Sequence, residues 1–97
     1  MAHTPDQVLD EAAELFRERN GAYGDAYLRH GKLMASLFPK GITLKDENDF
    51  IRFGIFNMMM SKACRTAENF PTGGHEDSSL DASVYAAMLH SVETGDG

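Results

Sequence analysis

The sequence predicts an all-α protein of four helices joined by short connections. Apolar residues recur at the three- and four-residue spacing of a helix face. Clusters of helix-breaking residues divide the chain at 20–21, 39–41 and 70–74. No stretch alternates apolar and polar residues as a half-buried strand does. Since 97 residues are one domain's length, we expect a single compact domain over 1–97.

The first helix is predicted over residues 5–19. Thr4-Pro5-Asp6-Gln7 is a helix start, with Thr4 as the N-cap, Pro5 at the first helical position and Gln7 completing a capping box. Apolar residues then follow at helical spacing, at Val8, Leu9, Ala12, Leu15 and Phe16. Asn20-Gly21 is predicted to end the helix, because glycine readily adopts the left-handed conformation after a C-terminus.

The second and fourth helices are bounded by similar signals. The second is predicted over 25–38, capped by Asp25 and ended by Pro39-Lys40-Gly41. The fourth is predicted over 78–92, after a loop at 70–74. Its apolar face is expected at Leu80, Val84, Tyr85, Ala87, Met88 and Val92.

The third helix is predicted over 44–69, after a cap at Thr43 and Asp46. It is apolar nearly all round, and its narrow polar stripe consists of Gly54, Asn57, Ser61, Arg65 and Glu68. Such a helix is central to a core or shared with another subunit. Because the chain has few elements with which to cover it, we expect a homodimer or higher oligomer, with Phe53, Phe56, Met60 or Ala63 at the contact.

Composition excludes several classes of function. Fifteen acidic against nine basic residues give a net charge of −6, which argues against nucleic-acid binding through a basic face. A single cysteine, Cys64, cannot form an internal disulfide, and the N-terminus lacks the pattern of a signal peptide. The densest apolar run, 53–60, is too short for a membrane span. We therefore expect a cytoplasmic protein with no membrane partner.

Two acidic residues at the start of the fourth helix are candidates for a metal site. Asp77 and Asp81 are one turn apart, near the middle of the expected apolar face. Inward carboxylates are costly unless a positive group meets them, and Mg²⁺ prefers oxygen ligands. The alternative is that Asp77 caps the helix and Asp81 pairs with a lysine or arginine.

Two basic residues on the third helix are candidates for phosphate binding. Lys62 and Arg65 are three residues apart and so lie on one side of the helix. Arginine binds phosphate oxygens bidentately. The alternative is that Arg65 neutralises Asp81 or Glu68 while Lys62 lies in solvent.

Two loop residues are weaker candidates for ligand contacts. Tyr23 stands in a glycine-flanked turn, where a ligand could approach the backbone, although turn chemistry alone also explains the pattern. His75 follows Gly73-Gly74 and could face a phosphate, or it could simply be solvated.

Together these segments resemble small phage-encoded MazG-like proteins. Arg19-Asn20-Gly21-Ala22-Tyr23-Gly24-Asp25 is similar to the R-x-x-x-Y-G-D opening of that family. Lys62 and Arg65, His75-Glu76-Asp77-Ser78 and the segment from Asp81 to Met88 are similar to its second half, K-x-x-R … H-x-D-S … D-x-x-x-Y-A-A. The family is similar to the all-α nucleoside triphosphate pyrophosphohydrolases, which are Mg²⁺-dependent, usually oligomeric enzymes that cut a nucleotide between its α- and β-phosphates.

The resemblance implies a role for each candidate. Asp77 and Asp81 would hold Mg²⁺, with Glu76 or Glu11 completing the site. Lys62 and Arg65, with His75, would bind phosphates, and Tyr23 or Tyr85 would stack on the base. The source would be a bacteriophage, and the place of action the host cytoplasm.

The pattern departs from the wider superfamily at its metal motifs. There, an E-x-x-E helix and an E-x-x-D helix lie close in sequence. Here, Glu11 and Glu14 match the first motif far earlier in the chain than Asp77. Two interpretations stay open: a MazG-like pyrophosphohydrolase, or a non-catalytic phage protein that binds a nucleotide or a host protein. Convergence of three carboxylates from two helices would favour the first.

Overall fold

A computed structural model describes residues 3–95, apart from the side chains of residues 22 and 23. It contains helices α1 (Pro5–Tyr23), α2 (Ala26–Leu37), α3 (Glu47–Glu68) and α4 (Glu76–Glu93), with a 3₁₀ turn, η1 (Phe70–Thr72), between the last two. Residues 3–95 include no strand, so the predicted all-α class with four helices is confirmed. None of these helices is long and apolar enough to cross a membrane.

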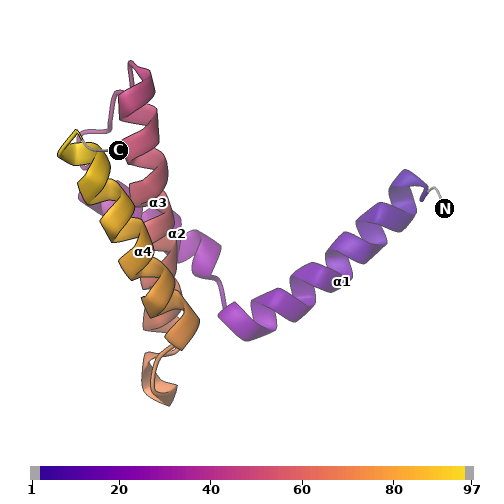
Figure 1. The fold of residues 1–97 in the computed structure, drawn as a ribbon. Helices are drawn as coiled ribbons and strands as arrows, with labels where there is room; N and C mark the ends of the chain where they lie inside the picture. Colours follow the sequence, from indigo (N-terminus) through magenta and orange to yellow (C-terminus); the bar gives the residue numbers. More distant parts are fainter. Residues whose placement is uncertain (1–2, 96–97) are drawn as a thin grey trace.

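Helices α3 and α4 form the centre of the fold. They run antiparallel and side by side, and α2 lies across α3 on another side (Figure 1). Among the described residues only Cys64 on α3 and Ser78 on α4 are buried, with exposed fractions of 8 and 1%. The chain by itself therefore encloses very little core.

Helix α1 projects from the other helices as an arm (Figure 1). The radius of gyration is 16.8 Å, against about 12.5 Å for a compact domain of this length. The prediction of a compact arrangement is therefore wrong for the single chain. The reason is that the apolar stripe of α1 finds little to pack on: Val8, Leu9, Leu15 and Phe16 are each about half exposed or more.

The end of α1 also differs from the prediction. The helix passes through Gly21 and continues to Tyr23, and Gly24 ends it with a φ of +62°. The Gly24 N–H donates to the Asn20 carbonyl at 2.7 Å. At its start, the predicted capping box of Thr4 and Gln7 is confirmed, with the Thr4 N–H donating to Gln7 Oε1 at 3.0 Å.

The starts of the other helices follow their caps. Helix α3 begins at Glu47 rather than residue 44, because the Asp46 side chain accepts the Asp49 N–H at 2.8 Å and Thr43 lies outside the helix. Asp25 stands at the N-cap position of α2, but its side chain makes no capping hydrogen bond. Helix α4 begins at Glu76, two residues earlier than predicted, because His75 is its N-cap.

The face of α4 that packs on α3 is only partly the predicted one, since Tyr85 and Val92 are the predicted residues that belong to it. Leu80, Val84 and Met88 are 64, 47 and 47% exposed. The less exposed stripe is instead Ser78, Ala82, Tyr85, Leu89 and Val92. Both stripes have helical spacing, and the second includes small residues, which allow two helices to approach closely. The buried Ser78 hydroxyl lies 2.6 Å from His75 Nδ1, so its burial leaves no polar group unsatisfied.

Candidate functional site

A pocket of about 260 Å³ opens where the end of α1, the start of α2 and the second half of α3 meet. Two arginines, a histidine and two aromatic rings are among its lining residues. The lining consists of Phe16, Arg19, Asn20, Gly24, Ala26, Tyr27, His30, Ser61, Cys64 and Arg65. It therefore joins part of the Arg19–Asp25 motif to Arg65, although these are distant in sequence.

Gly24 brings the turn between α1 and α2 against the end of α3. Its backbone, at φ +62° and ψ −147°, lies in a region that is open almost only to glycine. A Cβ added there would lie 3.0 Å from Glu68 Oε1. A side chain at this position would therefore strain the backbone of the turn and displace the Glu68 carboxylate.

Two polar contacts hold α2 on α3. His30 Nε2 lies 2.8 Å from Asn57 Oδ1, and Arg29 forms an ion pair with Glu68. The Glu68 side chain is only 16% exposed. Its Oε1 is inaccessible to solvent and accepts no well-aligned hydrogen bond from the described residues. The positive charge of Arg29 therefore offsets the cost of burying this negative oxygen. Such pairs are sensitive to the loss of either partner.

The pocket lining has the chemistry of an anion site with an aromatic wall. The guanidinium groups of Arg19 and Arg65 suit phosphate or carboxylate oxygens. Phe16 and Tyr27 pack edge to face, with centroids 6.2 Å apart and an interplanar angle of 70°. Tyr27 is 61% exposed, so much of its side-chain surface is accessible to a ligand.

Cys64 is the floor residue of the pocket and is buried. Burial raises the pKa of its thiol; the carboxylate of Glu68 raises it further, and the cation of Arg29 opposes this. The thiol is therefore neutral near pH 7. A buried, neutral thiol is typical of a core residue and not of a nucleophile.

The predicted inward carboxylates are exposed. Asp77 lies at the surface of the first turn of α4, and the Asp81 side chain is 51% exposed. Asp81 Oδ2 lies 3.3 Å from Lys62 Nζ, whose side chain is only 13% exposed. The prediction that both acids point into the core is wrong because α4 turns its other stripe toward α3. The alternative of an ion pair for Asp81 is confirmed, with Lys62 rather than Arg65 as its partner.

His75 is used as a helix cap. Its Nδ1 accepts the Ser78 N–H at 3.2 Å, so the alternative that Asp77 is the N-cap is also wrong. His75 lines a second, open pocket with Gly73 and Gly74, which shares no lining residue with the pocket at Arg65. Tyr85 is half-buried on α4, and the side chain of Tyr23 lies outside the described residues.

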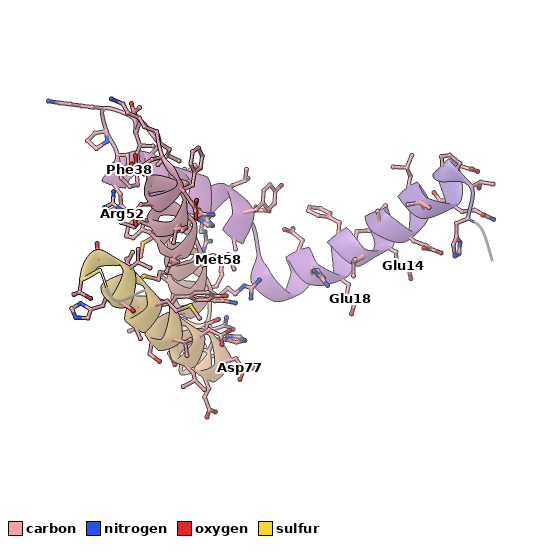
Figure 2. All side chains as sticks on the ribbon, turned by 45° about the horizontal axis from the view of Figure 1, so that its top comes forward. Glu14, Glu18, Phe38, Arg52, Met58 and Asp77 are labelled. Atoms are coloured by element: carbon pink, nitrogen blue, oxygen red, sulfur yellow. The ribbon has the colours of Figure 1, made fainter. Side chains whose placement is uncertain are left out.

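The acidic residues do not fit a magnesium site within one chain. Figure 2 shows Glu14 and Glu18 along the projecting α1, with Asp77 on α4. Glu11, also on α1, lies 3.4 Å from His3 Nδ1. Residues 3–95 contain no group of three His, Cys, Asp or Glu side chains arranged to hold a metal ion. The predicted set of Asp77, Asp81 and Glu11, with Glu76 nearby, is therefore not brought together.

The sequence did contain a signal for the pocket. Arg19 belongs to the first motif, yet no role follows for it from spacing alone. The polar stripe of α3 is the clearer signal: Asn57, Ser61, Arg65 and Glu68 are all partly or mostly buried, and all contact α2 or line the pocket. The polar stripe on an otherwise apolar helix is therefore the sequence pattern that indicates which side of α3 lines the site.

No protein family matches the chain, and comparisons with curated proteins and with solved structures give no match. The class of protein is therefore defined by its fold and its site: a helical protein with a pocket of arginine and aromatic residues beside its third helix.

Proposed function

We propose that the protein binds a nucleoside triphosphate in the pocket between the α1–α2 turn and α3. One observation carries the proposal: Arg19, Asn20 and Gly24 line the same pocket as Arg65. These residues belong to the two separate halves of the MazG-like resemblance. A shared ligand site gives a physical reason for both halves to occur in one chain.

The proposed roles follow from the side chains. Arg65 and Arg19 bind phosphate oxygens, because a planar guanidinium offers paired donors. The exposed ring of Tyr27 stacks on the base. We assign phosphate binding to Arg65 in preference to Lys62, because Arg65 lines the pocket and Lys62 does not.

The resemblance adds a reaction to this proposal. A MazG-like enzyme in the host cytoplasm would hydrolyse the triphosphate to a monophosphate and pyrophosphate. Water would attack the α-phosphorus as its bond to the α–β bridging oxygen breaks. Because the described acids of one chain do not fit a Mg²⁺ site, we derive no step through the metal. Binding is the part of the proposal that the geometry supports.

A non-catalytic nucleotide-binding protein is the second candidate. The ion pair between Lys62 and Asp81 favours it, because one of the two carboxylates expected to hold the metal already has a cationic partner. Both candidates use the same pocket and differ only in pyrophosphate release.

Calorimetric titration with a panel of nucleoside triphosphates tests binding. We expect Arg65→Ala to cost about 1–3 kcal/mol of binding free energy, as for a lost charge-assisted hydrogen bond. The matched control is Arg52→Ala, which removes an arginine of the same helix that pairs with Asp49 outside this pocket. Equal affinity of wild type and Arg65→Ala would remove Arg65 from the site.

Pyrophosphate release separates the two candidates. The same nucleotides are incubated with the wild-type protein with and without Mg²⁺. Release that needs Mg²⁺ and is lost in Arg65→Ala supports the enzyme. Tight binding without release from any nucleotide at high protein concentration supports the binding protein.

A further inference from the structure

Helix α3 is uncovered along one side of its first half. Phe50, Gly54 and Met58 are one turn apart and form a single ridge, which we call the α3 ridge. Phe50 and Met58 are 57 and 40% exposed, and the adjacent Ile51 is 42% exposed. Figure 2 labels Met58 and Arg52 on this helix, and Phe38 at the end of α2. An apolar ridge on a helix that is otherwise packed has the character of a contact surface.

Several other residues of α3 contact α2, its C-terminal end or α4 of the same chain. Phe53 and Phe56 pack against Phe38, with centroids 6.1 and 5.9 Å apart. Lys62 pairs with α4. Phe53 and Phe56, which were expected at a contact between subunits, are therefore partly covered by their own chain. Of the apolar residues between Phe50 and Met58, those that stay exposed are Phe50 and Met58 of the ridge and the adjacent Ile51.

Nothing in the chain itself requires a residue without a side chain at position 54. Gly54 lies inside α3, where glycine weakens a helix relative to alanine. A Cβ added there would meet nothing within 4 Å. Glycine is the residue that allows another backbone to approach closely. At the centre of an apolar ridge, the notch that it leaves fits a helix that is absent from the single chain.

The exposed area of the chain is that of a subunit. Its accessible surface is 7342 Å². A folded monomer of 10.7 kDa exposes about 5,500 Å². The excess, roughly 1,800 Å², is more than the ~800 Å² that each partner buries in an interface of standard size. Part of the excess belongs to the projecting α1, and a second copy that covers exposed apolar surface such as the α3 ridge would reduce the remainder.

We propose that the α3 ridge is a self-interface, across which α3 of a second copy packs with Gly54 at the crossing point. A twofold axis that passes between the Gly54 residues of two antiparallel α3 helices places Phe50 of each copy near Met58 of the other. The ridge is therefore complementary to itself. Large residues on either side of a glycine notch suit such a crossing. This proposal does not depend on nucleotide binding, because the ridge residues do not line the pocket.

Gly54→Leu tests the crossing, because the new side chain has open space in its own chain. We expect the wild type to sediment as a dimer and Gly54→Leu to dissociate about tenfold more readily or worse. Gly31→Leu is the matched control: Gly31 also lies inside a helix, and a Cβ there also meets nothing within 4 Å. It should leave the dimer intact. Circular dichroism confirms that both variants keep their helices.

Oxidative cross-linking gives an independent measurement. Gly54→Cys should form a covalent dimer under mild oxidation, whereas Gly31→Cys and the wild type, with its buried Cys64, should not. A wild type that is monomeric at all concentrations would overturn the proposal. So would a dimer that Gly54→Leu leaves as tight as Gly31→Leu does, because another surface would then form the contact.

Discussion

The two halves of α3 use their side chains in opposite ways. In the first half, apolar residues of the α3 ridge face outward, and Phe50 is 57% exposed. In the second half, polar residues face inward, and the Glu68 side chain is 16% exposed. A surface helix ordinarily shows the reverse pattern in both halves. The first half therefore exposes apolar surface, whereas the second half packs polar side chains against α2 and lines the pocket.

The neighbours of α3 explain this difference. Helix α2 contacts α3 through Arg29 and His30, which meet Glu68 at its end and Asn57 at its middle. These contacts satisfy inward polar groups and leave a pocket with Arg65 in its wall. Since α2 does not cover the ridge, the first half keeps apolar surface exposed.

The largest effect expected in the polar half comes from Gly24, which fits the α1–α2 turn to Glu68. Gly24→Ala should lower the free energy of unfolding by about 2–3 kcal/mol, because alanine is strained at this backbone conformation. Its Cβ would also press on Glu68 Oε1 at 3.0 Å. Urea denaturation measures the loss.

Gly21→Ala is the matched control for Gly24→Ala. Gly21 lies inside α1 with open space around it, so alanine there should stabilise the helix by up to about 1 kcal/mol. Equal effects of the two substitutions would mean that the turn is not fitted to Glu68.

A smaller effect is expected where α3 meets α4. Asp81→Asn should lower the free energy of unfolding by about 1 kcal/mol, because it leaves the mostly buried Lys62 without its carboxylate. The figure is modest because the Asp81 side chain is 51% exposed and water screens the pair. Asp77→Asn, the control on the same helix, should be nearly neutral, since Asp77 is exposed and His75 is the cap.

Thermal melts with and without Mg²⁺ complete this comparison. We expect the melting temperatures of wild type and both variants to be indifferent to the ion. A Mg²⁺-dependent rise in the wild type that Asp81→Asn abolishes would contradict the ion-pair interpretation and restore Asp81 as a metal ligand.

The smallest effect concerns pH and Cys64. Because its pKa is raised in the folded protein, the unfolded state loses this proton first as pH rises. Folding stability should therefore be unaffected near neutral pH and fall as pH rises through the ordinary thiol range, by less than about 1 kcal/mol at first. Urea midpoints at pH 7 and pH 9.5 measure this. Cys64→Ala should lose this part of the pH dependence, and an unchanged slope would show that other groups cause it.

The sequence alone determined the four helices and the N-terminal caps of two of them. Periodicity and punctuation predicted four helices and no strand, and the starts of α1 and α3 follow from Thr4, Gln7 and Asp46. These features depend on residues within one turn of each other, so they can be read along the chain. The near-continuous apolar surface of α3 also predicted that the chain needs a partner, which stays a prediction.

Only the tertiary structure decided which stripe of each helix meets which neighbour. Helix α4 has two stripes of helical spacing, and the one at Ser78, Ala82 and Tyr85 packs inward. This choice turns Asp77 and Asp81 outward and gives Lys62 its partner. The pocket likewise depends on the tertiary structure, because the turn at Gly24 places the end of α1, with Arg19, beside Arg65 of α3. Spacing along a helix fixes which residues share a face, but the partner of that face depends on competing contacts between distant segments.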